Sequence, residues 1–219
     1  MIRIVDNFEI IGRFIQDQAV GNDCYYHLQV IHRGKDDGTG ANSNEIKTYM
    51  IDRYHTIERY KDEIIKLCQM FNARAYINLS PKDKYNTCLG MLDTISKALR
   101  EGNFNYLQKI WNSVAGSEIS GKALYVVDVD DDKVERPLTL EVTDAKNQHG
   151  TVIDILQCIN EKCMPFDVTN KLVLVVPTLN GQHLITTGFD RETFNTFFPM
   201  IDVHKNNPTL LYASVTTKD

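Results

Sequence analysis

Two aspartates, a histidine and a third aspartate are the residues of this sequence whose types and spacing could do chemistry. Asp128 and Asp130 close an apolar run, His183 follows 55 positions after the first of them, and Asp202 follows 19 positions after the histidine. Carboxylates held close together repel, and a divalent cation relieves that repulsion because hard oxygen ligands suit Mg²⁺ or Mn²⁺. The four residues therefore predict a divalent-metal or phosphate site.

Each of these residues also has a simpler interpretation. The acidic run at residues 130–132 could be a solvated exit from a strand, and His183 after a turn could be an ordinary surface or core histidine. Asp202 could belong to a polar loop. The joint interpretation depends on whether separate elements bring the side chains to one face.

The second half of the chain predicts the element order β-α-β-β-α-β. Asn180-Gly181 is a turn signal between two strands, and Asp190 is a good N-cap for a helix. The expected elements are a strand at 123–129, a helix at 152–163, strands at 172–176 and 183–187, a helix at 191–198 and a strand at 210–215. This order is typical of the ferredoxin-like, or split βαβ, arrangement.

That arrangement has a geometric consequence for the four residues. With right-handed crossovers, the expected order in the sheet is last, first, third, second. The strand that carries Asp128 and Asp130 is then central, beside the strand that carries His183 and the strand that Asp202 precedes. Residues two apart on a strand project from the same face. We therefore expect the acids and the histidine to share one face.

The first part of the chain predicts a hairpin and helices. The expected elements are strands at 24–31 and 45–51 joined by a flexible loop at 34–44, helices at 57–71, 89–99 and 104–114, and a strand at 74–79. We expect an α+β protein in which residues 1–71 form an N-terminal hairpin and helix layer. Residues 72–219 would form the catalytic core, packed with that layer into one compact unit.

Composition limits the classes of protein that fit. A chain of 219 residues can bury a sizeable core, and its net charge of -5 means that no global positive field attracts nucleic acid. Any contact with a polynucleotide must therefore be local, metal-mediated or helped by a partner. No apolar run approaches the roughly 20 residues of a membrane helix, and no signal-peptide pattern opens the chain. We expect a cytoplasmic protein with no membrane contact, whose five cysteines are reduced and mostly buried.

Three short motifs resemble the signature motifs of the archaeo-eukaryotic primase superfamily, which includes primase-polymerases. They are Tyr-Val-Val-Asp-Val-Asp at 125–130, Gly-Gln-His at 181–183 and Ile-Asp at 201–202, and the resemblance extends over about residues 120–215. In that family the first and third motifs hold the catalytic metals, and the histidine contacts the phosphates of the incoming nucleotide. The resemblance implies catalytic and metal-binding roles for Asp128, Asp130 and Asp202. It implies nucleotide or phosphate contacts for His183 and Gly181.

The sequence departs from the family pattern in two places. Gly181 stands where the family usually has Ser, and the gap between His183 and Asp202 is short. Lys205 and Arg191 flank the motifs and are the first basic candidates for holding a triphosphate. Further basic candidates are Arg74, Lys82 and Lys84.

The resulting hypothesis is a metal-dependent nucleotidyltransferase, a DNA primase or DNA-directed polymerase with an RRM-like catalytic domain. It would use Mg²⁺ or Mn²⁺, nucleoside triphosphates and a single-stranded DNA or RNA template, and a replicative helicase would be a further partner in DNA replication. One alternative is a metal-dependent nuclease, since the same acids would serve it. The other is a catalytically inactive module that binds nucleic acid or a replication partner.

Overall fold

The structure, a computed structural model, describes residues 2–18, 21–34, 43–103, 121–131 and 151–216. The chain is mixed α+β and divides into two units. Unit 1 comprises residues 1–122 and 208–219, and unit 2 comprises residues 123–207. Each unit contains one antiparallel sheet.

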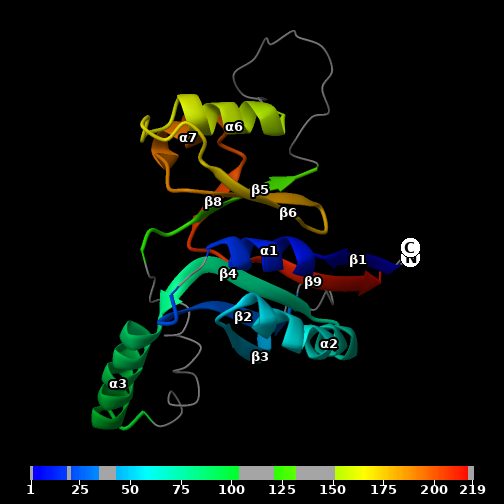
Figure 1. The fold of residues 1–219 in the computed structure, drawn as a ribbon, viewed down its shortest axis with the longest axis vertical. Helices are drawn as coiled ribbons and strands as arrows, with labels where there is room; N and C mark the ends of the chain where they lie inside the picture. Colours follow the sequence, from blue (N-terminus) through cyan, green and yellow to red (C-terminus); the bar gives the residue numbers. More distant parts are fainter. Residues whose placement is uncertain (1, 19–20, 35–42, 104–120, 132–150, 217–219) are drawn as a thin grey trace. The chain divides into compact units, whose positions relative to one another are not determined.

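Unit 1 contains a five-stranded sheet in the order β1-β9-β4-β2-β3 (Figure 1). Its strands are β1 (Ile2–Asp6), β2 (Cys24–His32), β3 (Asn44–Ile51), β4 (Arg74–Asp83) and β9 (Thr209–Thr216). Its described helices are α1 (Phe8–Gln18), α2 (Tyr54–Met70) and α3 (Lys84–Arg100). The β2–β3 hairpin, α2 and β4 lie close to where the sequence predicts them. α3 begins earlier than expected, because Asp83 caps its first turn by accepting a hydrogen bond from the Asn86 backbone N–H.

Helices α1 and α2 pack on the same face of this sheet. The Phe8 ring of α1 contacts the Tyr212 ring of β9, and the Tyr60 ring of α2 contacts the Tyr49 ring of β3. The strand residues on this face are fully or almost fully buried: Leu28, Val30, Tyr49, Ile51, Ala75 and Ile77. Residues that alternate with them on β2 and β4 therefore point to the other face.

Unit 2 contains a four-stranded sheet in the order β6-β7-β5-β8. Its elements are β5 (Tyr125–Asp130), α6 (Val152–Glu161), β6 (Leu172–Pro177), β7 (Gly181–Thr186), α7 (Arg191–Phe197) and β8 (Asp202–Lys205). Figure 1 shows α6 and α7 on the same side of the sheet. The helices cover the face to which Val127, Val129 and Leu184 point, and all three side chains are buried there.

Local sequence explains how both helices of unit 2 begin. Thr151 and Asp154 form a capping box at the start of α6. Asp190 accepts hydrogen bonds from the backbone N–H groups of Glu192 and Thr193 at the start of α7, as the sequence predicts. Because α6 is amphipathic, its buried stripe of Ile155, Cys158 and Ile159 fixes which side of the helix meets the sheet.

The expectation that residues 210–215 form the last strand of the catalytic core is wrong. These residues belong to β9, which lies between β1 and β4 in the sheet of unit 1, and the last strand of unit 2 is β8. β9 pairs with a strand on each side, and five successive residues of it are buried, from Thr209 to Ala213. The four-residue β8 escapes sequence-based prediction because Val203 is the one residue of the strand that packs against the core of unit 2.

The division of the chain also differs from the expected boundary at residue 72. β4, α3 and β9, expected in the catalytic core, belong to unit 1 with the N-terminal elements. β1 and α1 are not among the elements expected from the sequence. The helix expected over residues 104–114, and most of the loop expected over 34–44, lie outside the described residues.

Candidate functional site

Asp202, Asp128 and His183 form one row across three neighbouring strands of unit 2. In the register of the sheet, Asp128 of β5 is the direct partner of both His183 on β7 and Asp202 on β8. Directly opposite residues project from the same face, with Cβ atoms about 5 Å apart. Val127 points to the helices, so this row projects from the face opposite to them. The three strands therefore bring Asp128, His183 and Asp202 together on one face.

His183 and Asp128 lie close enough for an ion-pair contact. The His183 Nε2 to Asp128 Oδ1 distance is 3.5 Å. The histidine side chain is 14% exposed and the aspartate side chain 32%, so both remain partly accessible. An acidic oxygen at this distance can orient the ring, as carboxylates do for catalytic histidines.

Asp130 lies two residues along β5, on the same face, and its partner on β7 is Gly181. A Cβ built on Gly181 would lie 2.1 Å from the Val129 carbonyl oxygen and 2.8 Å from Asp130 Cα. No side chain fits at that distance without movement of the backbone. The absence of a hydroxyl at this motif position therefore follows from the close approach of the β7 backbone to β5.

The carboxylates share a face, but they are not drawn together around one point. Within the residues that the structure describes, no group of three or more His, Cys, Asp or Glu side chains is arranged to hold a metal ion. The type of donor nevertheless fits Mg²⁺ or Mn²⁺, because three carboxylates are available on one face.

The two basic residues predicted to flank the site have different positions in the structure. Lys205 is the partner of Tyr125, whose side chain packs against the hydrophobic core, so the register puts Lys205 on the helix-covered face. Arg191 donates a hydrogen bond from Nη1 to the Val203 carbonyl oxygen, at 3.3 Å. It therefore caps the outer edge of β8, which is an edge strand of the sheet.

His204 is a residue of this face that the sequence interpretation missed. It lies two residues after Asp202 on β8, its partner on β5 is Val126, and it is exposed. Alternation along a strand puts it on the face of Asp128 rather than the face of Lys205. The signal was present in the sequence as Asp-x-His at 202–204, but it is informative only once these residues are recognised as a strand.

The other basic candidates lie in unit 1. Lys82 is fully buried near the end of β4, opposite Tyr25. Lys84 opens α3 and donates from Nζ to the Asn22 carbonyl oxygen. Arg74 is half-buried at the start of β4. All three therefore belong to the other unit of the chain rather than to the sheet that carries the acids.

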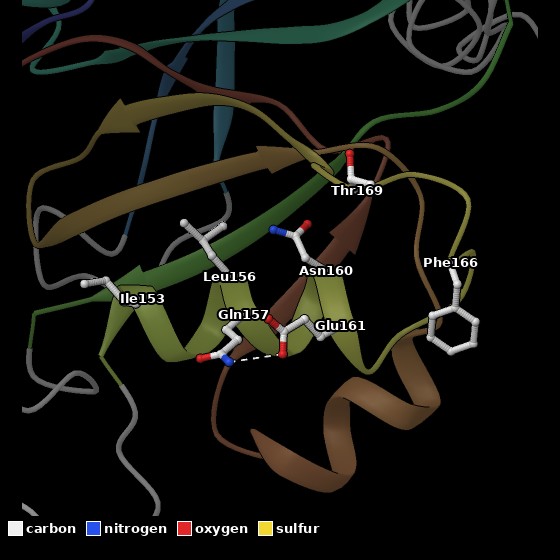
Figure 2. Close-up of a pocket in the computed structure, with 7 residues that line it drawn as sticks. All are labelled: Ile153, Leu156, Gln157, Asn160, Glu161, Phe166 and Thr169. Carbon is white, nitrogen blue, oxygen red and sulfur yellow. Dashed lines mark hydrogen bonds between the residues drawn. The ribbon is translucent and has the colours of Figure 1, made fainter.

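A shallow pocket of unit 2 lies apart from the acidic row, on the helix side. Figure 2 shows its lining residues, which come from α6 and from the segment between α6 and β6: Ile153, Leu156, Gln157, Asn160, Glu161, Phe166 and Thr169. The one hydrogen bond drawn there joins the Gln157 side-chain amide to the Glu161 carboxylate at 3.0 Å. The pocket contains none of the residues that the sequence predicts for the site.

The chain matches no protein-family model, no curated protein and no solved structure. Among the described residues, the structure contains no helix with the length and apolar character needed to cross a membrane. The five cysteines are unbridged, and Cys68, Cys158 and Cys163 are buried.

Proposed function

We propose that unit 2 is a ferredoxin/RRM-like catalytic domain that carries out metal-dependent nucleotidyl transfer of the primase or primase-polymerase type. The strand order β6-β7-β5-β8, with α6 and α7 on one face, supports this topology. The substrates would be nucleoside triphosphates and a single-stranded template. A replicative helicase would be a partner of the kind that the resemblance implies.

The observation that carries the proposal is the row of Asp202, Asp128 and His183. Three motifs separated by 55 and 19 positions in the chain become direct neighbours in the sheet. A solvated acidic exit from a strand would not require a partner acid and a partner histidine on the two adjacent strands. The same face also carries Asp130, with Gly181 beside it.

Each side chain has a distinct role in this proposal. Asp128, Asp130 and Asp202 would hold Mg²⁺ or Mn²⁺, which when bound would supply the positive charge that activates a 3′-hydroxyl and stabilises a leaving pyrophosphate. His183 would donate a hydrogen bond to a phosphate oxygen of the triphosphate, and Asp128 would orient its ring. Gly181 allows the β7 backbone to approach the backbone of β5 at Asp130.

The experiment is an assay of a labelled primer on a single-stranded template, with nucleoside triphosphates and either Mg²⁺ or Mn²⁺. We expect extension or primer synthesis by the intact chain. Asp128→Ala and Asp130→Ala should each lower the rate at least about a hundredfold, and His183→Ala should raise the KM for the nucleotide more than it lowers kcat. Asp131→Ala is the matched control, since Asp131 lies just after β5 and outside the row.

The same assay separates the alternatives. Cleavage of the labelled strand without added nucleotide, abolished in Asp128→Ala, would assign the site to a nuclease. Absence of both extension and cleavage with either metal would leave unit 2 as a non-catalytic module and would overturn the proposal.

A further inference from the structure

The face of the unit 1 sheet opposite α1 and α2 carries basic and aromatic side chains. On β4, Arg74 and Tyr76 alternate with the buried Ala75 and Ile77, so they project away from those helices. Arg33, just after β2, reaches the same face, because its Nη1 donates a hydrogen bond to the Tyr76 hydroxyl at 3.1 Å. Arg33 therefore meets the Tyr76 hydroxyl, and Arg74 lies two residues from Tyr76 on the same face.

The register gives this face a defined polar neighbourhood. Tyr76 is the partner of Gln29 on β2, which is the partner of Thr48 on β3. Glu45 lies beside this row, and its carboxylate accepts hydrogen bonds from the Gln29 side-chain amide and the Thr48 hydroxyl. Its charge is thus partly satisfied within the sheet. Arg33, Arg74 and Tyr76 are each partly exposed.

Cations also lie on the helix-covered side of unit 1. There Lys47 pairs with Glu63, and Lys61 lies 3.9 Å from Asp6. Cations on that side are thus balanced by neighbouring carboxylates. The opposite face carries the guanidinium groups of Arg33 and Arg74, in a chain whose net charge is -5.

We propose that Arg33, Arg74 and Tyr76 form a platform that binds single-stranded nucleic acid. Guanidinium groups bind phosphate oxygens bidentately and also stack on bases. An aromatic ring on a sheet face stacks on an unpaired base, as in other single-strand binding sheets. A duplex hides its base faces, so this pattern favours a single strand. The inference goes beyond the catalytic proposal, because binding on unit 1 requires no turnover by unit 2.

The test is fluorescence anisotropy of the full chain with a labelled oligo(dT) of about 20 nucleotides, repeated over a series of salt concentrations. Tyr76→Ala should weaken binding about tenfold, as expected for removal of one stacked base. Arg33→Ala combined with Arg74→Ala should make the slope of log affinity against log salt shallower by about 1.4, because each phosphate that is no longer neutralised lowers the slope by about 0.7.

Matched controls come from the rest of unit 1. Arg59 lies over the Tyr60 ring on α2, so Arg59→Ala removes an arginine beside a tyrosine from the other side of the sheet. Tyr85→Ala removes a 70% exposed tyrosine from α3. Both variants should bind as the unmodified chain does, and thermal melting should show every variant folded.

Several outcomes would overturn the proposal. One such outcome is that the chain does not bind oligo(dT) at low salt. Another is that it binds a duplex of the same length, or poly-glutamate, as tightly as it binds oligo(dT). A third is that Arg59→Ala weakens binding as much as the substitutions in the platform do. A chain that binds but never extends a primer would overturn the catalytic proposal alone.

Discussion

At Gly181 the backbone of β7 lies against the backbone of β5, and the lack of a side chain there has a measurable consequence. Because a Cβ there would meet the Val129 carbonyl oxygen at 2.1 Å, Gly181→Ser should force the two strands apart. We expect a decrease of about 1–3 kcal/mol in the free energy of unfolding, as for other overpacked sites. Urea denaturation measures it.

Gly188→Ala is the control for this substitution. Its Cβ would lie 3.7 Å from the nearest atom, on the Tyr125 ring, which is an ordinary contact. If Gly181→Ser is as stable as Gly188→Ala, then β7 does not approach β5 too closely at Gly181 for a side chain to fit. The serine common at this position of the resembling family would then fit here too.

His27 gives a pH-dependent prediction at the same scale. It is buried on β2, and burial together with the positive charge of Lys82 lowers the pKa of His27 to about 4 from its ordinary value of 6.5. The folded chain then binds fewer protons at this site than the unfolded chain between pH 4 and 6.5. The contribution of neutral His27 to the free energy of unfolding is therefore fully present above about pH 6.5. Up to about 3 kcal/mol of this free energy is lost as the pH falls toward 4.

The measurement compares unfolding free energies between about pH 4 and 7.5 for His27→Gln and the unmodified chain. The variant should show a shallower fall below about pH 6.5, because the titrating ring is gone. His55→Gln, at an exposed position in α2, should keep the original slope. An unchanged slope in His27→Gln would show that this histidine is not held neutral.

At the scale of elements, Lys171 secures the end of α6. It is fully buried just before β6, and its Nζ donates to the carbonyl oxygens of Ile159 at 2.9 Å and Asn160 at 3.2 Å. A cation at the C-terminal end of a helix satisfies its last carbonyls and opposes its dipole. This lysine, which is ten residues beyond the end of α6 in the chain, therefore acts as a helix cap.

Lys171→Met should destabilise unit 2 by about 2 kcal/mol, because it keeps the length of the side chain but removes the donor. Thermal or urea unfolding checks this value. Lys162→Met is the control, since Lys162 is exposed at the C-cap of the same helix. Equal stability of the two variants would contradict the capping role.

Much of the candidate face could be predicted from sequence, for local reasons. The apolar run before Asp128, the Asn180-Gly181 turn and the Asp190 cap each encode their element within a few residues. The strands and sheets to which residues 201–216 belong could not be predicted, because β8 and β9 are separated by a short turn yet join different sheets. Only long-range pairing with β5 on one side, and with β1 and β4 on the other, decides it.

That error had a direct effect on the site residues. If residues 210–215 were the last strand, residues 202–207 would be a loop. In a loop, Lys205 could lie beside the acids, and the direction of the His204 side chain would be undefined. Once β8 is known, alternation reverses these assignments, because His204 shares the face of Asp202 and Lys205 does not. The three aspartates and His183 did not depend on the error, since Asp202 stands at the start of the true strand.

At the scale of the whole molecule, unit 2 is inserted between two parts of unit 1. The chain leaves unit 1 before residue 123 and returns to it after residue 207, where β9 fills the position between β1 and β4. Residues 123–207 expressed alone should therefore fold, because their sheet and the core beneath α6 and α7 belong to this unit alone. Circular dichroism should show one cooperative unfolding transition.

Removal of residues 208–219 should unfold unit 1. Without β9, β1 loses its only strand partner within the described residues, and β4 keeps one of two. The truncated chain should lose the transition of unit 1 and keep that of unit 2. A fragment 123–207 that stays unfolded, or a truncation that leaves both transitions intact, would contradict this division.

The central claim is that the row of Asp128, Asp202 and His183 is a site for a divalent cation and the phosphates of a nucleotide. The most direct measurement is a Mn²⁺ titration followed by electron paramagnetic resonance, with a nucleoside triphosphate present and the signal of unbound Mn²⁺ as the readout. We expect binding by the intact chain, an affinity at least about tenfold weaker in Asp128→Asn, and unchanged affinity in Asp131→Asn. Equal Mn²⁺ affinity in all three proteins would contradict the claim.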